Sequence, residues 1–153
     1  ILRSLDHANI IKITRVAGSK EKDKVYIVME YLDHEVKELL KWVRFRECEV
    51  RRLMKDLLEG MAYLHDRKIV HRDLKTSNLL YSNEGILKIC DFGLARKAAQ
   101  SLMTQEVITM WYRPPELLLG EYNYSTELDI WSVGCIMAEL VLRDAMFKGK
   151  SEL

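Results

Sequence analysis

The sequence predicts an α+β fold, and three stretches of the chain carry that prediction. Residues 25–32 (VYIVMEYL) are rich in β-branched and aromatic side chains and follow a polar turn, so they predict a strand whose partner is the stretch 10–16. In residues 47–65, apolar side chains recur at the i, i+3, i+4, i+7 spacing of an amphipathic helix. Residues 126–142 predict a second long helix, apolar nearly all round and therefore expected to be buried.

Shorter elements lie around these helices. Residues 79–81 and 86–90 flank a polar turn and predict a β-hairpin. Thr126 and Asp129 have the spacing of a capping box at the start of the second long helix. Residues 93–116 form a long irregular segment, and loops of that length inside a compact domain are usually functional or disordered.

Composition and charge exclude several classes of protein. The 24 Lys and Arg residues balance 23 Asp and Glu residues, so bulk charge gives no reason to expect direct nucleic-acid or membrane binding. No apolar run approaches the roughly 20 residues of a membrane helix. Cys48, Cys90 and Cys135 are odd in number and lack CxxC spacing, which predicts reduced thiols in a cytosolic or nuclear protein.

Three motifs follow one another in a fixed order. Residues 71–78 (HRDLKTSN) match H-R-D-L-x-x-x-N, residues 91–93 (DFG) follow after one hairpin, and residues 114–116 (PPE) stand where A-P-E is placed. A lone HRD or DFG carries little weight, because a solvated turn explains it equally well. The ordered set resembles the catalytic core of protein kinases, which implies a protein-kinase-like fold.

The resemblance also implies a domain organisation. Residues 1–153 would be a partial protein kinase domain, with the end of the N-terminal lobe and the hinge at 1–32. Residues 33–153 would form most of the helical C-terminal lobe, truncated after the buried helix. Both ends of the sequence resemble cut ends, so we expect an excerpt that does not fold stably alone.

Phosphoryl transfer explains the residue types in these motifs. It requires positioning and charge neutralisation more than covalent chemistry. By resemblance, Asp73 accepts the proton of the substrate hydroxyl, and Asn78 and Asp91 supply the oxygen ligands that Mg²⁺ prefers. Lys75 would contact the transferring phosphate, as is typical of Ser/Thr kinases, and Thr109 would orient Asp73 and Lys75. The implied cofactors are ATP and Mg²⁺.

The resemblance further places a nucleotide site at the end of the first strand pair. Met29 would be the gatekeeper, and backbone groups of Glu30 and Leu32 would pair with adenine. Glu35 would reach the ribose, and Leu80 would form the floor of the adenine pocket. The alternative is that residues 29–32 are simply a buried strand end.

Other segments narrow the resemblance to one group. Residues 104–113 (TQEVITMWYR), 117–120 and 129–135 are similar to cyclin-dependent kinases, and residues 23–29 and 71–80 are most similar to the PITSLRE-type members. That likeness implies a cyclin partner and a location in the nucleus, with the cytoplasm as a further possibility. In this family an Asp in the position of Asp129 braces the backbone of the catalytic loop, which is compatible with a helix cap.

The likeness also implies a switch and a substrate preference. Thr104 would be an activating phosphosite, and Arg72 and Arg96 would bind its phosphate. An unmodified loop threonine is the alternative for Thr104. Arg113 would shape the pocket for a proline, so protein substrates with Ser/Thr-Pro sites are expected.

Two functions remain open from the sequence. One is an active, proline-directed Ser/Thr kinase of which the chain is a part. The other is a truncated, non-catalytic interaction module, because the Gly-rich loop and the strand lysine of kinases are absent from these 153 residues. The coding sequence upstream of residue 1 would distinguish them.

Overall fold

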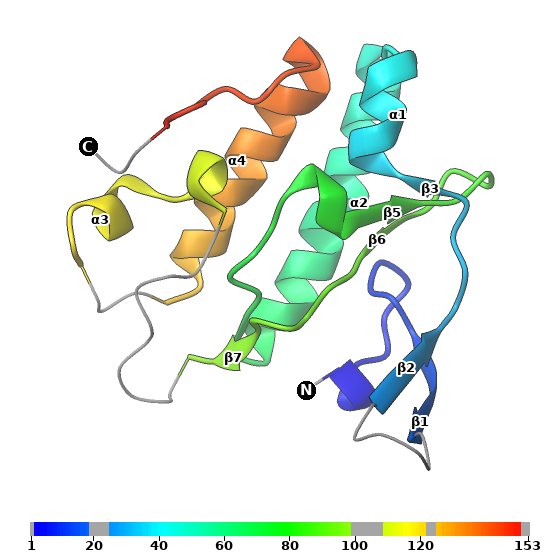
Figure 1. Ribbon diagram of the computed structural model, residues 1–153. Coiled ribbons are helices and arrows are strands. Elements are labelled where there is room, and N and C mark those ends of the chain that lie inside the picture. Colours follow the sequence, from blue (N-terminus) through cyan, green and yellow to red (C-terminus); the bar gives the residue numbers. More distant parts are fainter. Residues whose placement is uncertain (1, 19–24, 99–108, 122–124, 151–153) are drawn as a thin grey trace.

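The computed structural model describes residues 2–18, 25–98, 109–121 and 125–150. Thr104, the predicted phosphosite, lies outside these residues. Figure 1 shows the arrangement of the elements. In chain order they are η1 (Leu2–Ser4), β1 (Ile13–Gly18), β2 (Val25–Met29), β3 (His34–Glu35), α1 (Val36–Trp42), α2 (Glu47–Asp66), β4 (Ile69–Val70), η2 (Thr76–Asn78), β5 (Leu79–Tyr81), β6 (Leu87–Ile89), β7 (Arg96–Lys97), η3 (Met110–Tyr112), α3 (Pro115–Leu118) and α4 (Glu127–Leu142), where η marks a 3-10 helix.

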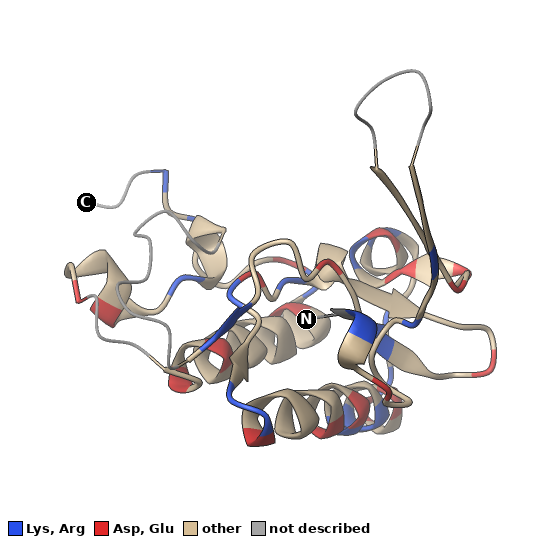
Figure 2. Ribbon diagram, turned by 90° about the horizontal axis from the view of Figure 1, so that it is seen from below, with Lys and Arg blue, Asp and Glu red and all other residues tan. Residues whose placement is uncertain are grey.

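The first strand pair forms as predicted, but its second strand is shorter. β1 and β2 pair antiparallel from Ile13↔Met29 to Gly18↔Val25, so β2 ends at Met29 and not at residue 32. All five residues of β2 are exposed, and the hairpin projects away from the helices (Figure 2). Met29, where the strand ends, is 44% exposed, so a buried strand end is the wrong description of it.

The helical body is built on α2 and α4, which lie side by side (Figure 1). α2 confirms the amphipathic prediction, because Leu53, Leu57 and Leu64 are at most 1% exposed. The carboxylate of Glu49 accepts a hydrogen bond from the Arg46 backbone N–H at 2.7 Å and so caps the first turn. The seven-residue helix α1 was not predicted.

The predicted hairpin is also present, and the catalytic loop, residues 71–78, leads directly into its first strand, β5. β5 and β6 pair antiparallel with Leu80 opposite Lys88, and β3 extends this sheet along the other edge of β5. The segment before β1 lies against β6, since Ile11 donates its N–H to the Ile89 carbonyl and Ile89 donates to Asn9. Side chains from α2, β5, β6 and the catalytic loop meet in one core.

Two predictions about α4 are wrong. Thr126 has helical dihedral angles and makes no side-chain capping bond, so there is no capping box. The helix is also not buried all round: Leu128 and Ile136 are fully buried, whereas Met137 and Val141 are 51% and 60% exposed. The buried side packs into the core, and the exposed side includes Met137 and Val141.

The described surface carries interspersed charges. Both acidic and basic positions occur along α2 (Figure 2). In the described ranges, no helix is long and apolar enough to cross a membrane. The three cysteines are free thiols: Cys48 is exposed, Cys90 half-buried and Cys135 buried.

Candidate active site

The backbone of the catalytic loop is held by one buried carboxylate from α4. Asp129, 1% exposed, accepts the backbone N–H of His71 on Oδ2 and that of Arg72 on Oδ1, both at 2.9 Å. Arg72 has a φ of +68°, a left-handed conformation that is unfavourable for residues other than glycine. His65 from α2 adds a third bond to Asp129 at 3.0 Å. Asp129 therefore braces the loop, as the family reading predicted.

The His71 ring is neutral and connects the catalytic loop to the strand that ends before Asp91. Its Nε2 lies 3.0 Å from the Cys90 carbonyl, which can only accept, and its Nδ1 lies 3.3 Å from the Asp73 N–H, which can only donate. This pattern requires the Nε2–H tautomer. Complete burial lowers the pKa of His71, more strongly than Asp129 and the Cys90 carbonyl raise it. The ring also packs edge-on against Phe92.

Asp73 is held at both carboxylate oxygens. Oδ1 accepts the Thr109 hydroxyl at 3.0 Å, and Oδ2 accepts Lys75 Nζ at 2.8 Å. Lys75 Nζ also donates to the Thr109 hydroxyl at 3.0 Å, which closes a triangle of contacts. The structure thus brings Thr109 to Asp73 and Lys75, which lie 36 and 34 residues before it, and the resemblance had assigned all three to one site.

Asn78 completes the loop from the other side. Its Nδ2 donates to the Asp73 backbone carbonyl at 2.7 Å and to Asp73 Oδ2 at 3.1 Å. Because the amide nitrogen is committed to Asp73, the amide oxygen is the atom that can face a cation. The Asn78 carbonyl accepts the Cys90 N–H at 3.0 Å, so the catalytic loop is tied to the residue directly before Asp91.

Asp91 stands at an exposed turn next to these groups. Its φ is +57°, and its Oδ1 accepts the Gly93 N–H at 3.2 Å. A Cβ at Gly93 would lie 3.2 Å from that oxygen, which is a tight contact and favours glycine there. Among the described residues, no group of three or more His, Cys, Asp or Glu could hold a metal ion.

A buried polar network behind the loop was missed by the sequence analysis. Glu139 accepts the Thr76 hydroxyl on Oε1 at 3.1 Å and the Tyr112 hydroxyl on Oε2 at 2.5 Å, and Ser132 donates to the Tyr112 carbonyl. Burial and the Glu139 carboxylate raise the pKa of Tyr112. The network joins α4 to η2 and η3. Glu139, the one acid in the otherwise apolar stretch 133–142 of α4, was the signal that could have revealed it.

A cavity of about 370 Å³ opens beside Asp91 and reaches the β1–β2 hairpin. Predicted residues Met29, Leu80 and Asp91 line it, and they come from β2, β5 and the turn after β6. Burial, with a smaller contribution from Asp91, raises the pKa of the Cys90 thiol to about 12, so this thiol is uncharged at neutral pH. The full lining is Ile13, Ile27, Met29, Leu80, Cys90, Asp91, Phe92 and Gly93.

The remaining predicted nucleotide contacts lie outside that lining. Glu30 directs its carboxylate to Lys88 Nζ, with oxygen–nitrogen distances of 2.8 and 2.9 Å. Leu32 is half-buried against the core. Glu35 lies in β3 opposite Leu80, the cavity floor.

Of the predicted phosphate and substrate arginines, Arg72 lies in the catalytic loop, and Arg96 and Arg113 lie in the segment 93–116. Arg72 is 3% exposed and donates from Nε to the Leu94 carbonyl at 2.6 Å. Arg96 is exposed in β7, which pairs with the β4 strand that leads into the catalytic loop. Arg113 follows η3 and is half-buried.

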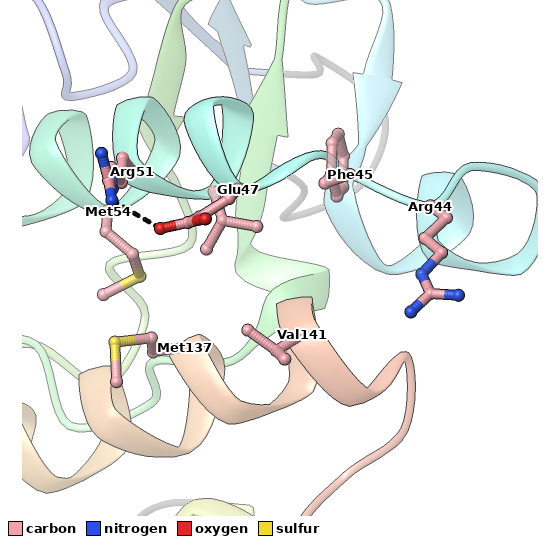
Figure 3. A pocket seen from close by; sticks show the side chains of 8 residues that line it. Arg44, Phe45, Glu47, Arg51, Met54, Met137 and Val141 are labelled. Atoms are coloured by element: carbon pink, nitrogen blue, oxygen red, sulfur yellow. Dashed lines mark hydrogen bonds and ion pairs between the residues drawn. The ribbon is translucent and has the colours of Figure 1, made fainter.

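A second hollow lies between the start of α2 and the end of α4 (Figure 3). Its volume is about 350 Å³, and Met54 and Met137 approach each other across it from the two helices. Arg51 at its edge is paired with Glu47. None of the motif residues lines this hollow, which separates it from the catalytic loop.

Comparison with known proteins decides the family. A family model described as the protein kinase domain matches residues 1–153. The chain belongs to the protein kinase domain family. The predicted protein-kinase fold is confirmed by the solved yeast RNA Pol II CTD kinase CTDK-1 complex, in which one chain matches with a TM-score of 0.92 and 49% sequence identity. That match covers 99% of this chain and 51% of the yeast chain.

The curated relatives are cyclin-dependent kinases. Cyclin-dependent kinase G-2 of Oryza sativa subsp. indica is 50% identical, covering 99% of this chain and 22% of the relative. Cyclin-dependent kinase 11B of Homo sapiens is 50% identical, covering 96% of this chain and 19% of the relative. Cyclin-dependent kinase 11 of Dictyostelium discoideum is 43% identical, covering all of this chain and 44% of the relative. The likeness to cyclin-dependent kinases, including the PITSLRE type, is confirmed. The chain spans less than half the length of these relatives.

Proposed function

We propose that this chain is part of a cyclin-dependent Ser/Thr protein kinase that transfers the γ-phosphoryl group of Mg-ATP to Ser or Thr hydroxyls, preferably before proline. One observation carries the proposal. The carboxylate of Asp73 is fixed at both oxygens, next to a cavity whose edge bears the second acid, Asp91.

The geometry supports a base role for Asp73. Its carboxylate, held by Thr109 and Lys75, can accept the proton of an incoming hydroxyl while keeping its orientation. Lys75 carries a positive charge at the same point and can stabilise negative charge on a transferring phosphoryl group. Asn78 binds the Asp73 backbone carbonyl and so holds the loop in place around Asp73. The Asp73 carboxylate and the Lys75 ammonium group therefore keep a fixed separation.

The residues fit ATP and Mg²⁺. The cavity is mostly apolar, with Leu80 and Met29 on its walls, as a purine ring requires. Asp91 and the amide oxygen of Asn78 are hard oxygen donors, and Mg²⁺ takes its other ligands from phosphates and water. When bound, the ion would neutralise phosphate charge; the chain itself orients the acceptor hydroxyl and removes its proton.

The cyclin partner and the substrate class rest on the relatives. They are named cyclin-dependent kinases, and the yeast neighbour belongs to a complex described as an RNA Pol II CTD kinase. The half-buried Arg113, next to η3, supports a pocket near the activation segment. A nuclear location belongs to the same proposal and rests on the family likeness.

The proposal is tested with the longest gene product that contains residues 1–153, purified with a cyclin. It should phosphorylate a Ser-Pro peptide in the presence of Mg²⁺ and ATP, and a Ser-Ala peptide more slowly. Asp73→Asn should lower kcat by about 10²- to 10⁴-fold, the contribution of a general base. Equal turnover by Asp73→Asn and wild type would overturn the kinase proposal and favour a non-catalytic interaction module.

Thr104 is proposed as the activating phosphosite of this kinase. Support comes from the sequence likeness and from the placement of two arginines. Arg96 lies in β7 opposite Val70, the residue two positions before Arg72. Thr104→Ala should strongly reduce activity, because a phosphate with about −1.5 to −2 charges would no longer order the segment. Unchanged turnover of Thr104→Ala would contradict the phosphoswitch alone.

A further inference from the structure

The side chain of Glu30 occupies an unusual position directly after β2. Its backbone N–H donates to the Lys12 carbonyl at 3.0 Å, and its Oε1 accepts the Lys12 N–H at 2.7 Å. The same carboxylate receives Lys88 Nζ on both oxygens, at 2.8 and 2.9 Å. One residue thus joins the end of the hairpin, the segment before β1 and strand β6.

Lys88 reaches this carboxylate from the sheet that forms the cavity floor. It lies in β6 directly opposite Leu80, and it lies two residues before Cys90. Opposite residues of an antiparallel pair, and residues two apart in one strand, lie on the same face of a sheet. Leu80 and Cys90 both line the cavity, so Lys88 shares the face on which a nucleotide would lie.

The pair is better shielded than an ordinary surface ion pair. The Lys88 and Glu30 side chains are 18% and 30% exposed, whereas the neighbouring Lys12–Asp6 pair is 67% and 89% exposed, with a distance of 3.7 Å. Exposed pairs contribute little because water and salt screen them. The hairpin itself is exposed along all of β2, so this pair is one of its main links to the sheet beneath.

We propose that Glu30 and Lys88 form a positioning pair for the nucleotide site. Their ion pair fixes the chain after Met29 above the Leu80 floor, and so sets the height of the adenine pocket. This is a role of the two side chains, separate from any backbone contact of Glu30 with adenine. The inference rests on the proposed ATP-dependent function.

The test measures kinetics of the cyclin-bound kinase with Lys88→Met and Lys88→Arg. Lys88→Met should raise KM for ATP by about 3- to 10-fold with kcat within about twofold, because it removes preorganisation of binding and leaves Asp73 untouched. Lys88→Arg keeps the charge and should stay near wild type. Glu30→Gln should match Lys88→Met, and the double variant should be no worse than either, as for residues that act as a pair.

Lys12→Met is the matched control, since it removes an equal charge from the exposed pair on the same segment. Its KM for ATP should not change. Hydrogen exchange without nucleotide gives a second readout: the amides of Lys12 and Glu30 should exchange faster in Lys88→Met, while the α1 terminal amide of Val43 should not.

Each result decides a different claim. An unchanged KM for ATP in Lys88→Met, or an equal rise in Lys12→Met, would overturn the positioning pair and leave the proposed kinase function standing. A fall in kcat with a lowered thermal midpoint would also overturn it, because a purely structural role predicts that pattern. A wild-type protein without Mg-ATP-dependent activity would contradict the proposed function and this inference together.

Discussion

The catalytic loop and the β1–β2 hairpin are held in opposite ways. In the loop, Arg72, Asp73 and Asn78 are at most 8% exposed and are bonded to one another, to α4 and to the turn before Asp91. In the hairpin every residue of β2 is exposed, and few contacts connect it with the body. The geometry of the loop is therefore fixed by polar contacts within these residues, whereas the position of the hairpin, which borders the proposed nucleotide cavity, depends on a small number of links.

Removing Asp129 should break this comparison most strongly. Asp129→Ala leaves the N–H groups of His71 and Arg72 buried without an acceptor and removes the support for the left-handed Arg72. Because an unsatisfied buried donor costs about 1–3 kcal/mol, the loss of unfolding free energy should be about 2–5 kcal/mol. Urea unfolding measures it. Asp66→Ala, at the exposed end of α2, is the control, and an equal loss in both variants would contradict the brace.

Thr109→Val tests the loop through its effect on kcat, not through the free energy of unfolding. The hydroxyl links Asp73 to Lys75, and without it both groups can move, so kcat should fall by about 10- to 100-fold. Thr109→Ser should retain activity.

Thr14→Val is the matching change in the hairpin, where the hydroxyl donates to the Val28 carbonyl at 3.0 Å. It should leave kcat unchanged. If it lowered kcat as much as Thr109→Val, the proposed division between the loop and the hairpin would not hold.

The neutral His71 predicts how stability depends on pH. Burial lowers its pKa in the folded protein below the ordinary value of 6.5, so below that pH the unfolded chain binds a proton that the folded protein does not. Stability is thus fully present above about pH 6.5 and falls as the pH drops, by at most about 1.4 kcal/mol per pH unit from this group.

The measurement is the free energy of unfolding at pH values from about 5 to about 8, a range that spans the ordinary pKa of histidine. His71→Gln, which cannot titrate, should have a smaller slope than wild type below about pH 6.5. A slope unchanged by His71→Gln would show that this ring is not held neutral.

Motif spacing predicted which polar residues lie together better than apolar patterns predicted what surrounds each helix. Asp73, Asn78 and Thr109 were assigned to one site from motifs at fixed offsets, and their side chains are in hydrogen-bond contact. The spacing of Thr126 and Asp129 led to a wrong prediction of a capping box, because an aspartate at this position can either cap its own helix or bind a distant loop. Asp129 instead serves two amides 57 and 58 residues away, a partner that no short window contains.

The other misses have similar causes. Tyr112 and Glu139 meet across 27 residues, so neither sequence neighbourhood reveals their bond. The apolar composition of α4 predicted burial on all sides, but composition does not say which neighbours cover each side. Its exposed side includes Met137, which faces Met54 across the second hollow (Figure 3).

The smallest expected effect is on that exposed side of α4. Met137→Lys should reduce the free energy of unfolding by less than about 1 kcal/mol, because a half-exposed methionine loses little burial and the lysine stem can cover the same surface. Ile136→Lys, at the fully buried neighbouring position, should cost several times more, since it buries a charge without a partner. Equal losses in the two variants would mean that another part of the protein covers Met137, and that α4 is buried on both sides as its composition predicted.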